Sequence, residues 1–190
     1  GMNEHGLTVT INAAKSTMPT SSATPISILT REILQYAQTI EEAYEIARSR
    51  NTFVAESILI GSAKDGKAAI IEKSPDNIAL FTQDERQQII CTNHYQSEAF
   101  ADEKNNLENM ETSDSPYRYK RLEELLGQQH PVDELKAASV LRDHKGIADT
   151  DLGLTNEMAI NQFIAHHSVI FKPEQRIIWV STSPWQSGKY

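Results

Sequence analysis

Two β-hairpins constrain the fold of this chain more strongly than any other feature of its sequence. In the first, the pair Asp65-Gly66, which is typical of tight hairpin turns, separates the apolar segments 57–61 and 68–72. In the second, a short polar turn separates the apolar segments 168–171 and 176–180. Because a short turn can join only antiparallel neighbours, the sequence predicts mostly antiparallel sheets.

Weaker signals predict further strands and two loops. Apolar and hydroxyl residues alternate over 7–11, which indicates a strand with one buried face. Apolar runs predict two more strands, over 78–81 and 88–91. The segment 15–25 is rich in Ser, Thr and Pro and is predicted to be a loop. The polar segment 102–114 is predicted to be an exposed loop.

Three segments have the spacing or end signals of helices. The first, 28–50, is predicted to form two short helices that break near Thr39, because Thr39 and Glu42 can form a capping box. The second, 115–126, begins with the cap signal Ser-Pro, and the third covers 131–142. The order of strand, helices, strands, helices and strands is typical of a layered α+β protein.

Composition limits the classes of function. The chain has 190 residues, enough for one domain over 1–190, and its net charge of -8 argues against binding to nucleic acid. No apolar run approaches the ~20 residues that a membrane-spanning helix needs. Cys91 is the only cysteine, so no internal disulfide can form. The six histidines and Cys91 show no metal-ligand spacing, so we predict no metal site and no cofactor.

Five segments, in the same order along the chain, resemble the acyl-CoA:6-aminopenicillanic acid acyltransferase group, which is related to choloylglycine hydrolases and penicillin V acylases. They are Gly1–Leu7 (G-M-N-E-H-G-L), Thr92–Tyr95 (T-N-H-Y), Ser115–Leu122 (S-P-Y-R-Y-K-R-L), Leu141–Gly146 (L-R-D-H-K-G), and Ser168–Phe171 with Trp179–Ser181. The resemblance implies the fold of the N-terminal-nucleophile (Ntn) hydrolases, an αββα sandwich in which two antiparallel sheets are stacked.

The resemblance also implies a mechanism and a missing part. In this family an N-terminal cysteine, exposed by autocatalytic cleavage, attacks an amide or thioester carbonyl, and its own α-amine is the base. The chain begins at Gly1, inside a motif that follows that cysteine in the family. We therefore expect residues 1–190 to form the C-terminal two-thirds of such a domain, incomplete at the N-terminus. Gly1 is alternatively a remnant before a start residue, Met2.

The resemblance assigns three site residues. Asn93 and Asn3 correspond to amides that donate to the oxyanion of the tetrahedral intermediate, a role that suits a donor that does not titrate. Arg118 corresponds to the arginine near the nucleophile, and Arg121 competes for this assignment because a small shift of the motif exchanges the two. Asn93, Asn3 and Arg118 are expected to converge on one cavity. Without the resemblance, Asn93 would be read as a strand-end or turn residue.

The sequence favours structural roles for two other reactive residues, Cys91 and His94. Cys91 lies in an apolar run, where free cysteines are usually small buried hydrophobes rather than nucleophiles. His94 could line the site, but a structural hydrogen bond is the favoured role. The adjacent pair His166-His167 would point to opposite sides of an extended chain, so it is a poor metal site.

The predicted function is an amide hydrolase or acyltransferase of the cysteine Ntn type. It would act on a linear C–N amide or an acyl thioester such as acyl-CoA, and this chain would supply oxyanion and pocket residues. The alternative is a catalytically inactive fragment, or a ligand-binding scaffold of the same fold. Sheet edges left open by missing strands predict either a homo-oligomer or pairing with the missing N-terminal segment.

Overall fold

The computed structural model describes residues 1–17, 22–83, 88–127, 131–153, 155–182 and 188–190. The chain divides into two compact units, one made of 1–112 with 173–176 and the other of 113–172 with 177–190. We describe each unit by itself. A single domain over 1–190 stays a prediction.

The first unit is built on a four-stranded antiparallel sheet of order β1-β2-β3-β4. Its strands are β1 (Leu7–Ala13), β2 (Glu56–Ser62), β3 (Lys67–Lys73) and β4 (Ile78–Phe81). The predicted hairpin joins β2 to β3, and Gly66 in its turn has a φ of +64°, a conformation that glycine adopts without strain. The side chain of Ser62 accepts a hydrogen bond from the Asp65 N–H in the same turn. The first hairpin and the strands predicted around 7–11 and 78–81 are therefore confirmed.

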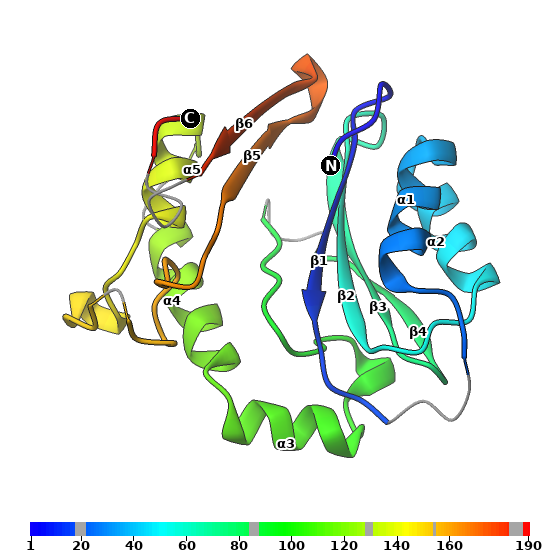
Figure 1. Ribbon diagram of the computed structural model, residues 1–190, viewed down its shortest axis with the longest axis horizontal. Coiled ribbons are helices and arrows are strands. Elements are labelled where there is room, and N and C mark those ends of the chain that lie inside the picture. Colours follow the sequence, from blue (N-terminus) through cyan, green and yellow to red (C-terminus); the bar gives the residue numbers. More distant parts are fainter. Residues whose placement is uncertain (18–21, 84–87, 128–130, 154, 183–187) are drawn as a thin grey trace. The chain divides into compact units, whose positions relative to one another are not determined.

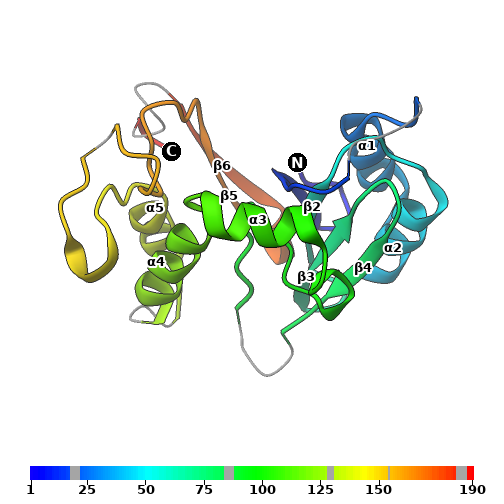
Figure 2. The ribbon, with the colours of Figure 1, turned by 90° about the horizontal axis from the view of Figure 1, so that it is seen from below.

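Helices α1 (Ile26–Tyr36) and α2 (Ile40–Ser49) lie side by side on one face of this sheet (Figures 1 and 2). The predicted break near Thr39 is confirmed, because Thr39 Oγ1 accepts a hydrogen bond from the Glu42 N–H at 3.2 Å and caps α2. The Glu42 carboxylate reaches back to the N–H of Gln38 rather than to that of Thr39. The second half of the capping box is thus displaced by one residue.

The main hydrophobic core lies between the two helices and the sheet. Alternate residues of the strands face the helices, as the two-residue period of a strand requires. The core contains these buried residues: Leu7, Val9, Leu29, Ile33, Ala37, Ile40, Ala43, Ala47, Ile58, Ile60, Ala69 and Ile71. On the strands, the residues between them point to the opposite face, where polar side chains such as Ser57 and Glu72 are also buried.

Two predictions about the rest of this unit are wrong. Residues 88–91 form no strand, and the Ile90 carbonyl accepts a hydrogen bond from the Gln96 side chain at 2.8 Å instead of from a neighbouring strand. The segment 102–114 is not an exposed loop. It contains the whole of α3 (Lys104–Thr112), which follows the short 3₁₀ helix η1 (Glu98–Phe100).

The second unit contains two helices and a hairpin. Helices α4 (Ser115–Gly127) and α5 (Glu134–Leu141) pack together, and η2 (Ile147–Asp149) contacts α4 (Figures 1 and 2). Helix α5 begins three residues later than predicted, because the Asp133 carboxylate accepts a hydrogen bond from the Lys136 N–H and caps it. Strands β5 (Ser168–Lys172) and β6 (Ile177–Ser181) form the predicted second hairpin, turned by η3 (Pro173–Gln175).

The mixture of helices with two antiparallel sheets makes the chain an α+β protein, as predicted. The stacking of the two sheets into a sandwich stays a prediction. Among the described residues, no helix combines the length and the apolar composition needed to cross a membrane.

Candidate functional site

Residues 92–97, which begin with the T-N-H-Y segment, form a loop beside helix α3 that many hydrogen bonds hold in place. We call it the Asn93 loop. Asn109 on α3 donates a hydrogen bond from Nδ2 to the Asn93 carbonyl at 2.6 Å. Asn106, one turn earlier, bonds both polar groups of the Tyr95 backbone: its Oδ1 accepts from the N–H at 2.9 Å and its Nδ2 donates to the carbonyl at 3.2 Å. Both asparagines are buried, so these hydrogen bonds are shielded from water and hold the loop in place.

The buried carboxylate of Glu72 on β3 holds the other side of the loop. It accepts hydrogen bonds from the backbone N–H groups of Gln96 and Ser97 and from the Ser97 hydroxyl. One residue along the strand, the Lys73 carbonyl accepts a hydrogen bond from the Tyr95 hydroxyl at 2.6 Å. The loop is therefore attached to the sheet as well as to α3.

Burial of Glu72 and Cys91 changes the acidity of both groups. Burial raises the pKa of the Glu72 carboxyl above its usual value, and the hydrogen bonds from the loop only partly offset this effect. Burial, with the nearby charge of Glu72, raises the pKa of the Cys91 thiol to about 12. At pH 7 a thiol of that pKa is ionised to roughly one part in 10⁵. This environment favours a structural Cys91 over a nucleophile.

Asn93 is held at the end of β1. Its Nδ2 donates to the carbonyl of Ala13, the last residue of β1, at 2.8 Å. The strand predicted over 88–91, just before Asn93, is absent, and the loop bonded to α3 and Glu72 supports Asn93 instead. In the same loop, Thr92 Oγ1 and His94 Nδ1 are hydrogen-bonded at 3.2 Å, which is the structural bond expected of His94.

The four hydrogen bonds of the Asn3 side chain all go to backbone groups. Its Oδ1 accepts from the N–H groups of His5 and Leu7, both at 3.0 Å. Its Nδ2 donates to the carbonyls of Leu34 at 3.1 Å and Ala37 at 2.7 Å, at the C-terminal end of α1. These bonds use both donors and two acceptor sites of the amide. Asn3 thus joins the turn before β1 to α1.

The structure does not bring Asn3 and Asn93 together. Asn3 bonds to Leu7 at the start of β1, whereas Asn93 bonds to Ala13 at its end. Six residues of strand at ~3.3 Å each separate the two positions by about 20 Å. One oxyanion cannot accept from both amides, so the expected convergence of this pair is wrong. A catalytic role for either amide alone stays a prediction.

The G-M-N-E-H-G-L segment also contains a glycine that both its backbone conformation and its close packing require. Gly6 has a φ of +76°, and a Cβ atom there would lie 2.7 Å from the Pro173 carbonyl oxygen and 2.8 Å from the Ala63 Cβ. Beside it, Arg176 Nε donates to the Glu4 carbonyl at 2.6 Å. The segment therefore packs against the hairpin turn 173–176, and this contact lies within the first unit.

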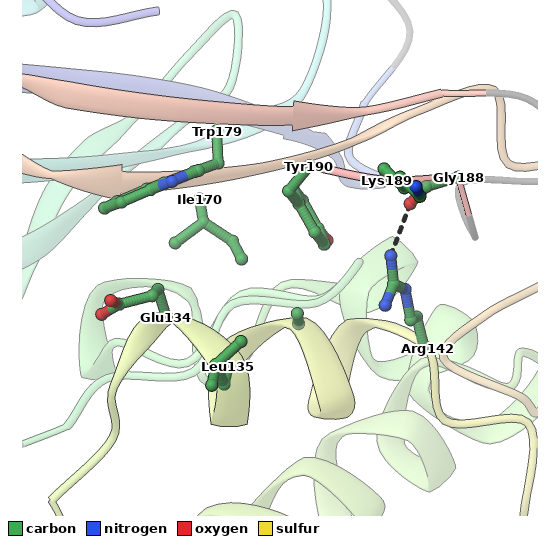
Figure 3. Close-up of a pocket in the computed structure, with 9 residues that line it drawn as sticks. Glu134, Leu135, Arg142, Ile170, Trp179, Gly188, Lys189 and Tyr190 are labelled. Atoms are coloured by element: carbon green, nitrogen blue, oxygen red, sulfur yellow. Dashed lines mark hydrogen bonds between the residues drawn. The ribbon is translucent and has the colours of Figure 1, made fainter.

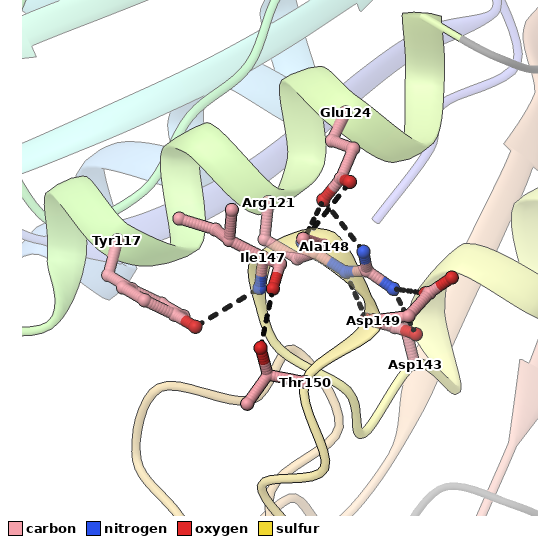
Figure 4. Close-up of polar contacts among 8 residues, drawn as sticks. All are labelled: Tyr117, Arg121, Glu124, Asp143, Ile147, Ala148, Asp149 and Thr150. Atoms are coloured by element: carbon pink, nitrogen blue, oxygen red, sulfur yellow. Dashed lines mark hydrogen bonds and ion pairs between the residues drawn. The ribbon is translucent and has the colours of Figure 1, made fainter.

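In the second unit, the buried side chain of Arg121 lies at the centre of an ion-pair network (Figure 4). Its Nε and Nη2 bind the two oxygens of Asp143 at 2.8 and 3.0 Å. Nη2 also contacts Asp149 at 2.9 Å, and Nη1 contacts Glu124 at 2.7 Å. The hydrogen bonds to Asp143 chiefly raise the pKa of the guanidinium, against the opposing effect of burial. All three nitrogen atoms of the Arg121 guanidinium therefore bind carboxylates of the second unit.

The same network fixes an unusual turn after α5. Ala148 and Asp149 both have positive φ angles, of 54° and 59°, which are strained for residues with a Cβ. The Ala148 N–H bonds the Glu124 carboxylate, and the Ile147 N–H bonds the Tyr117 hydroxyl at 3.0 Å (Figure 4). The S-P-Y-R-Y-K-R-L and L-R-D-H-K-G segments are thus two parts of one packed arrangement.

Arg118 has a different environment from Arg121. It is partly buried, and burial lowers the pKa of its guanidinium, while the charges of Asp114 and Glu157 act in the opposite direction. Arg121 is committed to carboxylates of its own unit, and the assignment of Arg118 as the site arginine stays a prediction. Arg118 belongs to the second unit and Asn93 to the first, so their convergence stays a prediction.

A pocket of about 370 Å³ adjoins the Asn93 loop within the first unit. It is lined by His94, Tyr95, Gln96, Ser97, Glu98, Ala101, Asn106, Leu107 and Met110. Leu107 and Met110 are exposed apolar residues, so the pocket could take an apolar group of modest size. Within the described ranges no cluster of His, Cys, Asp and Glu could hold a metal ion.

Comparison with known proteins agrees with the resemblance found in the five segments. The sequence profile of the acyl-coenzyme A:6-aminopenicillanic acid acyl-transferase family matches residues 1–183. The chain therefore belongs to this family. No curated protein matches the chain.

Proposed function

We propose that this chain is part of an amide hydrolase or acyltransferase of the cysteine Ntn type. Its substrates are linear amides or acyl thioesters, and it supplies oxyanion and pocket residues rather than the nucleophile. The observation that carries the proposal is the Asn93 loop. A family motif presents a neutral donor at the sheet edge, and two buried asparagines and a buried glutamate fix its position.

The nucleophile in this proposal is a cysteine that the 190 residues do not contain. Cys91 is the only cysteine, and its pKa near 12 leaves it protonated at neutral pH. An N-terminal cysteine needs no such environment, because its own α-amine, with a pKa of ~7.7–8.0, removes the proton.

The open edge of β1 is where we place the missing segment. Gly1 and Val9 exchange two backbone hydrogen bonds of 2.8 Å, so residues 1–3 run antiparallel along this edge. A strand that continued the pairing beyond Gly1 would pass Ile11 and reach Ala13, beside the Asn93 amide. Until such a strand is added, the edge at Ile11 favours association with a second copy of the chain.

Two finer features belong to the same proposal. The fold is the αββα sandwich that the family resemblance implies. The role of Arg118 is that of the family's arginine near the nucleophile, where a guanidinium favours the thiolate and orients neighbouring polar groups. The pocket next to the loop receives the acyl group, because its exposed apolar residues are Leu107 and Met110.

Hydrolysis of penicillin V and of N-acyl amino acids tests this proposal. The 190-residue chain should show no turnover by itself. Turnover should appear when the chain is extended by a segment that begins with the family's cysteine. In the extended protein, Asn93→Ala should lower kcat by about 10²–10³, the usual effect of removing one oxyanion donor. Asn51→Ala, at an exposed asparagine of the first unit outside the loop, is the matched control and should leave kcat unchanged.

Three outcomes would contradict the proposal. Turnover by the 190-residue chain that Cys91→Ala abolishes would identify Cys91 as the nucleophile. Turnover that survives Cys91→Ala would show that the chemistry does not use cysteine. An extended protein that folds but has no activity would support the alternative of an inactive scaffold.

A further inference from the structure

A second pocket lies wholly within the second unit and has no part in the proposed function (Figure 3). Its volume is about 490 Å³, which is within the range of small-molecule sites. It is lined by Glu134, Leu135, Ala138, Arg142, Ile170, Trp179, Gly188, Lys189 and Tyr190. These residues come from α5, both strands of the hairpin and the segment 188–190.

One end of this pocket is positively charged. Arg142 donates from Nη2 to the Gly188 carbonyl, and its guanidinium lies 5.0 Å from the centre of the Tyr190 ring (Figure 3). Its Nε is buried and has no hydrogen-bond partner among the residues that the structure describes. Among the described residues no carboxylate pairs with Arg142, and Lys189 adds a second positive charge to the lining.

The other walls of the pocket are largely apolar. Trp179 and Ile170 project from the hairpin, and Leu135 projects from α5, where it is 77% exposed (Figure 3). Glu134 is the one acidic residue of the lining, and its carboxylate is already paired with Lys172 at 3.7 Å. Among the side chains of the described lining, the charge that is not already paired is therefore positive.

The arginine is held in place by its neighbours in sequence. Its N–H bonds the Ala138 carbonyl at the end of α5, and the next residue, Asp143, is fixed by two bonds to Arg121. A backbone anchored on both sides reduces the entropy lost when the side chain binds a ligand. Arg142 thus belongs to the L-R-D-H-K-G segment but makes none of the bonds described for the Arg121 network.

We propose that this pocket binds a small carboxylate that carries an apolar tail, such as an alkyl or aryl carboxylic acid. The planar guanidinium matches the two oxygens of a carboxylate, and the apolar tail would lie against Trp179, Ile170 and Leu135. A cationic ligand would meet Arg142 and Lys189, and a neutral ligand would leave their charges uncompensated in a partly closed site.

Binding of octanoate to the Trp185→Phe chain tests the proposal, because Trp179 is then the only tryptophan and reports on the pocket. Octanoate should quench its fluorescence in a saturable way, and calorimetry should give the same Kd. Octanamide and acetate are the matched ligands, since one lacks the charge and the other lacks the tail. Each should bind at least tenfold more weakly than octanoate. Equal binding of octanoate and octanamide, or of octanoate and acetate, would overturn the proposal.

Variants of Arg142 give an independent test. Arg142→Gln should weaken octanoate binding at least tenfold, and Arg142→Lys should weaken it less. Arg48→Gln, an exposed arginine of the first unit, should have no effect. If Arg142→Gln does not fold, Leu135→Ala replaces it, because the exposed Leu135 can be shortened without loss of the fold and should still weaken binding. Unchanged binding in the variant that folds would refute the site. This result does not depend on amidase activity, so it is distinguishable from failure of the proposed function.

Discussion

Replacement of Arg121 by Gln tests whether its ion pairs hold the second unit together. The Arg121 side chain is 3% exposed and contacts three carboxylates through four hydrogen bonds. Gln has a similar shape near the backbone but no charge, and it cannot bind both oxygens of Asp143 while also reaching Glu124. The substitution therefore removes the counter-charge without emptying the site.

The size of the effect depends on which carboxylates can return to water. The side chains of Glu124 and Asp149 are 29% and 69% exposed, so solvent can replace Arg121 for them. Asp143 is only 12% exposed and keeps an unpaired charge. Removal of one partner from a buried pair costs ~3–5 kcal/mol. Because only Asp143 of the three carboxylates keeps an unpaired charge, we expect the free energy of unfolding to fall by the lower limit of this range, about 3 kcal/mol.

Urea unfolding followed by Trp179 fluorescence measures this cost in the second unit. The Trp185→Phe background removes the other tryptophan. With an m-value of ~2 kcal/mol/M, a loss of about 3 kcal/mol lowers the urea midpoint by about 1.5 M. Arg48→Gln breaks an exposed pair with Glu45 and is the control, for which no measurable change is expected.

A second substitution separates the stranded charge from simple loss of packing. In the Arg121→Gln chain, Asp143→Asn removes the unpaired charge and should restore part of the lost stability. The reasoning is refuted if Arg121→Gln costs no more than Arg48→Gln, or if Asp143→Asn adds its full cost to that of Arg121→Gln.

Two further predictions concern the first unit. Gly6→Ala should lower the free energy of unfolding clearly more than Gly66→Ala. Both alanines adopt a positive φ that costs ~1–2 kcal/mol, but only the one at position 6 meets close neighbours. Equal melting temperatures for the two variants would show that the contact with Pro173 is unimportant. Burial raises the pKa of Glu72, so the folded state binds more protons than the unfolded state. Stability should therefore fall as pH rises from the usual value of 4.5 through the raised pKa, and this dependence should be weaker in Glu72→Gln when urea midpoints are compared.

The hairpins and the paired helices could be predicted because their signals are local. Asp65-Gly66 specifies a turn, and Thr39 specifies a helix start through a bond to a residue three positions away. The strands on both sides of each turn then follow from apolar alternation. Elements of this kind do not depend on distant parts of the chain.

Helix α3 was missed because its buried side is polar. Asn106 and Asn109 are buried, whereas Leu107 and Met110 are exposed. A search for apolar residues at helical spacing looks for the opposite arrangement. The buried asparagines are stable in place because each bonds backbone groups of the loop 92–97, and those partners could not be known from the sequence.

The site was predicted less completely than the fold for a similar reason. The choice between Arg118 and Arg121 depends on Asp143, which is 22 residues from Arg121. The separation of Asn3 from Asn93 depends on which end of β1 each side chain reaches. Both are long-range contacts that motif spacing does not contain. The resemblance identified the right segments without identifying the function of each residue.

The contacts made by these segments limit what a family match can say about activity. Asn3, Gly6, Arg121 and Asp143 all belong to matching segments, and each has a structural role in its own unit. A protein that kept the fold but had lost catalysis would still need these residues. The match therefore reports on folding more directly than on chemistry. The Asn93 side chain also bonds the Ala13 carbonyl, but Asn106, Asn109 and Glu72 hold the loop around it, so Asn93→Ala should affect turnover more than it affects stability. Measurement of both quantities in that variant separates an enzyme from an inactive scaffold.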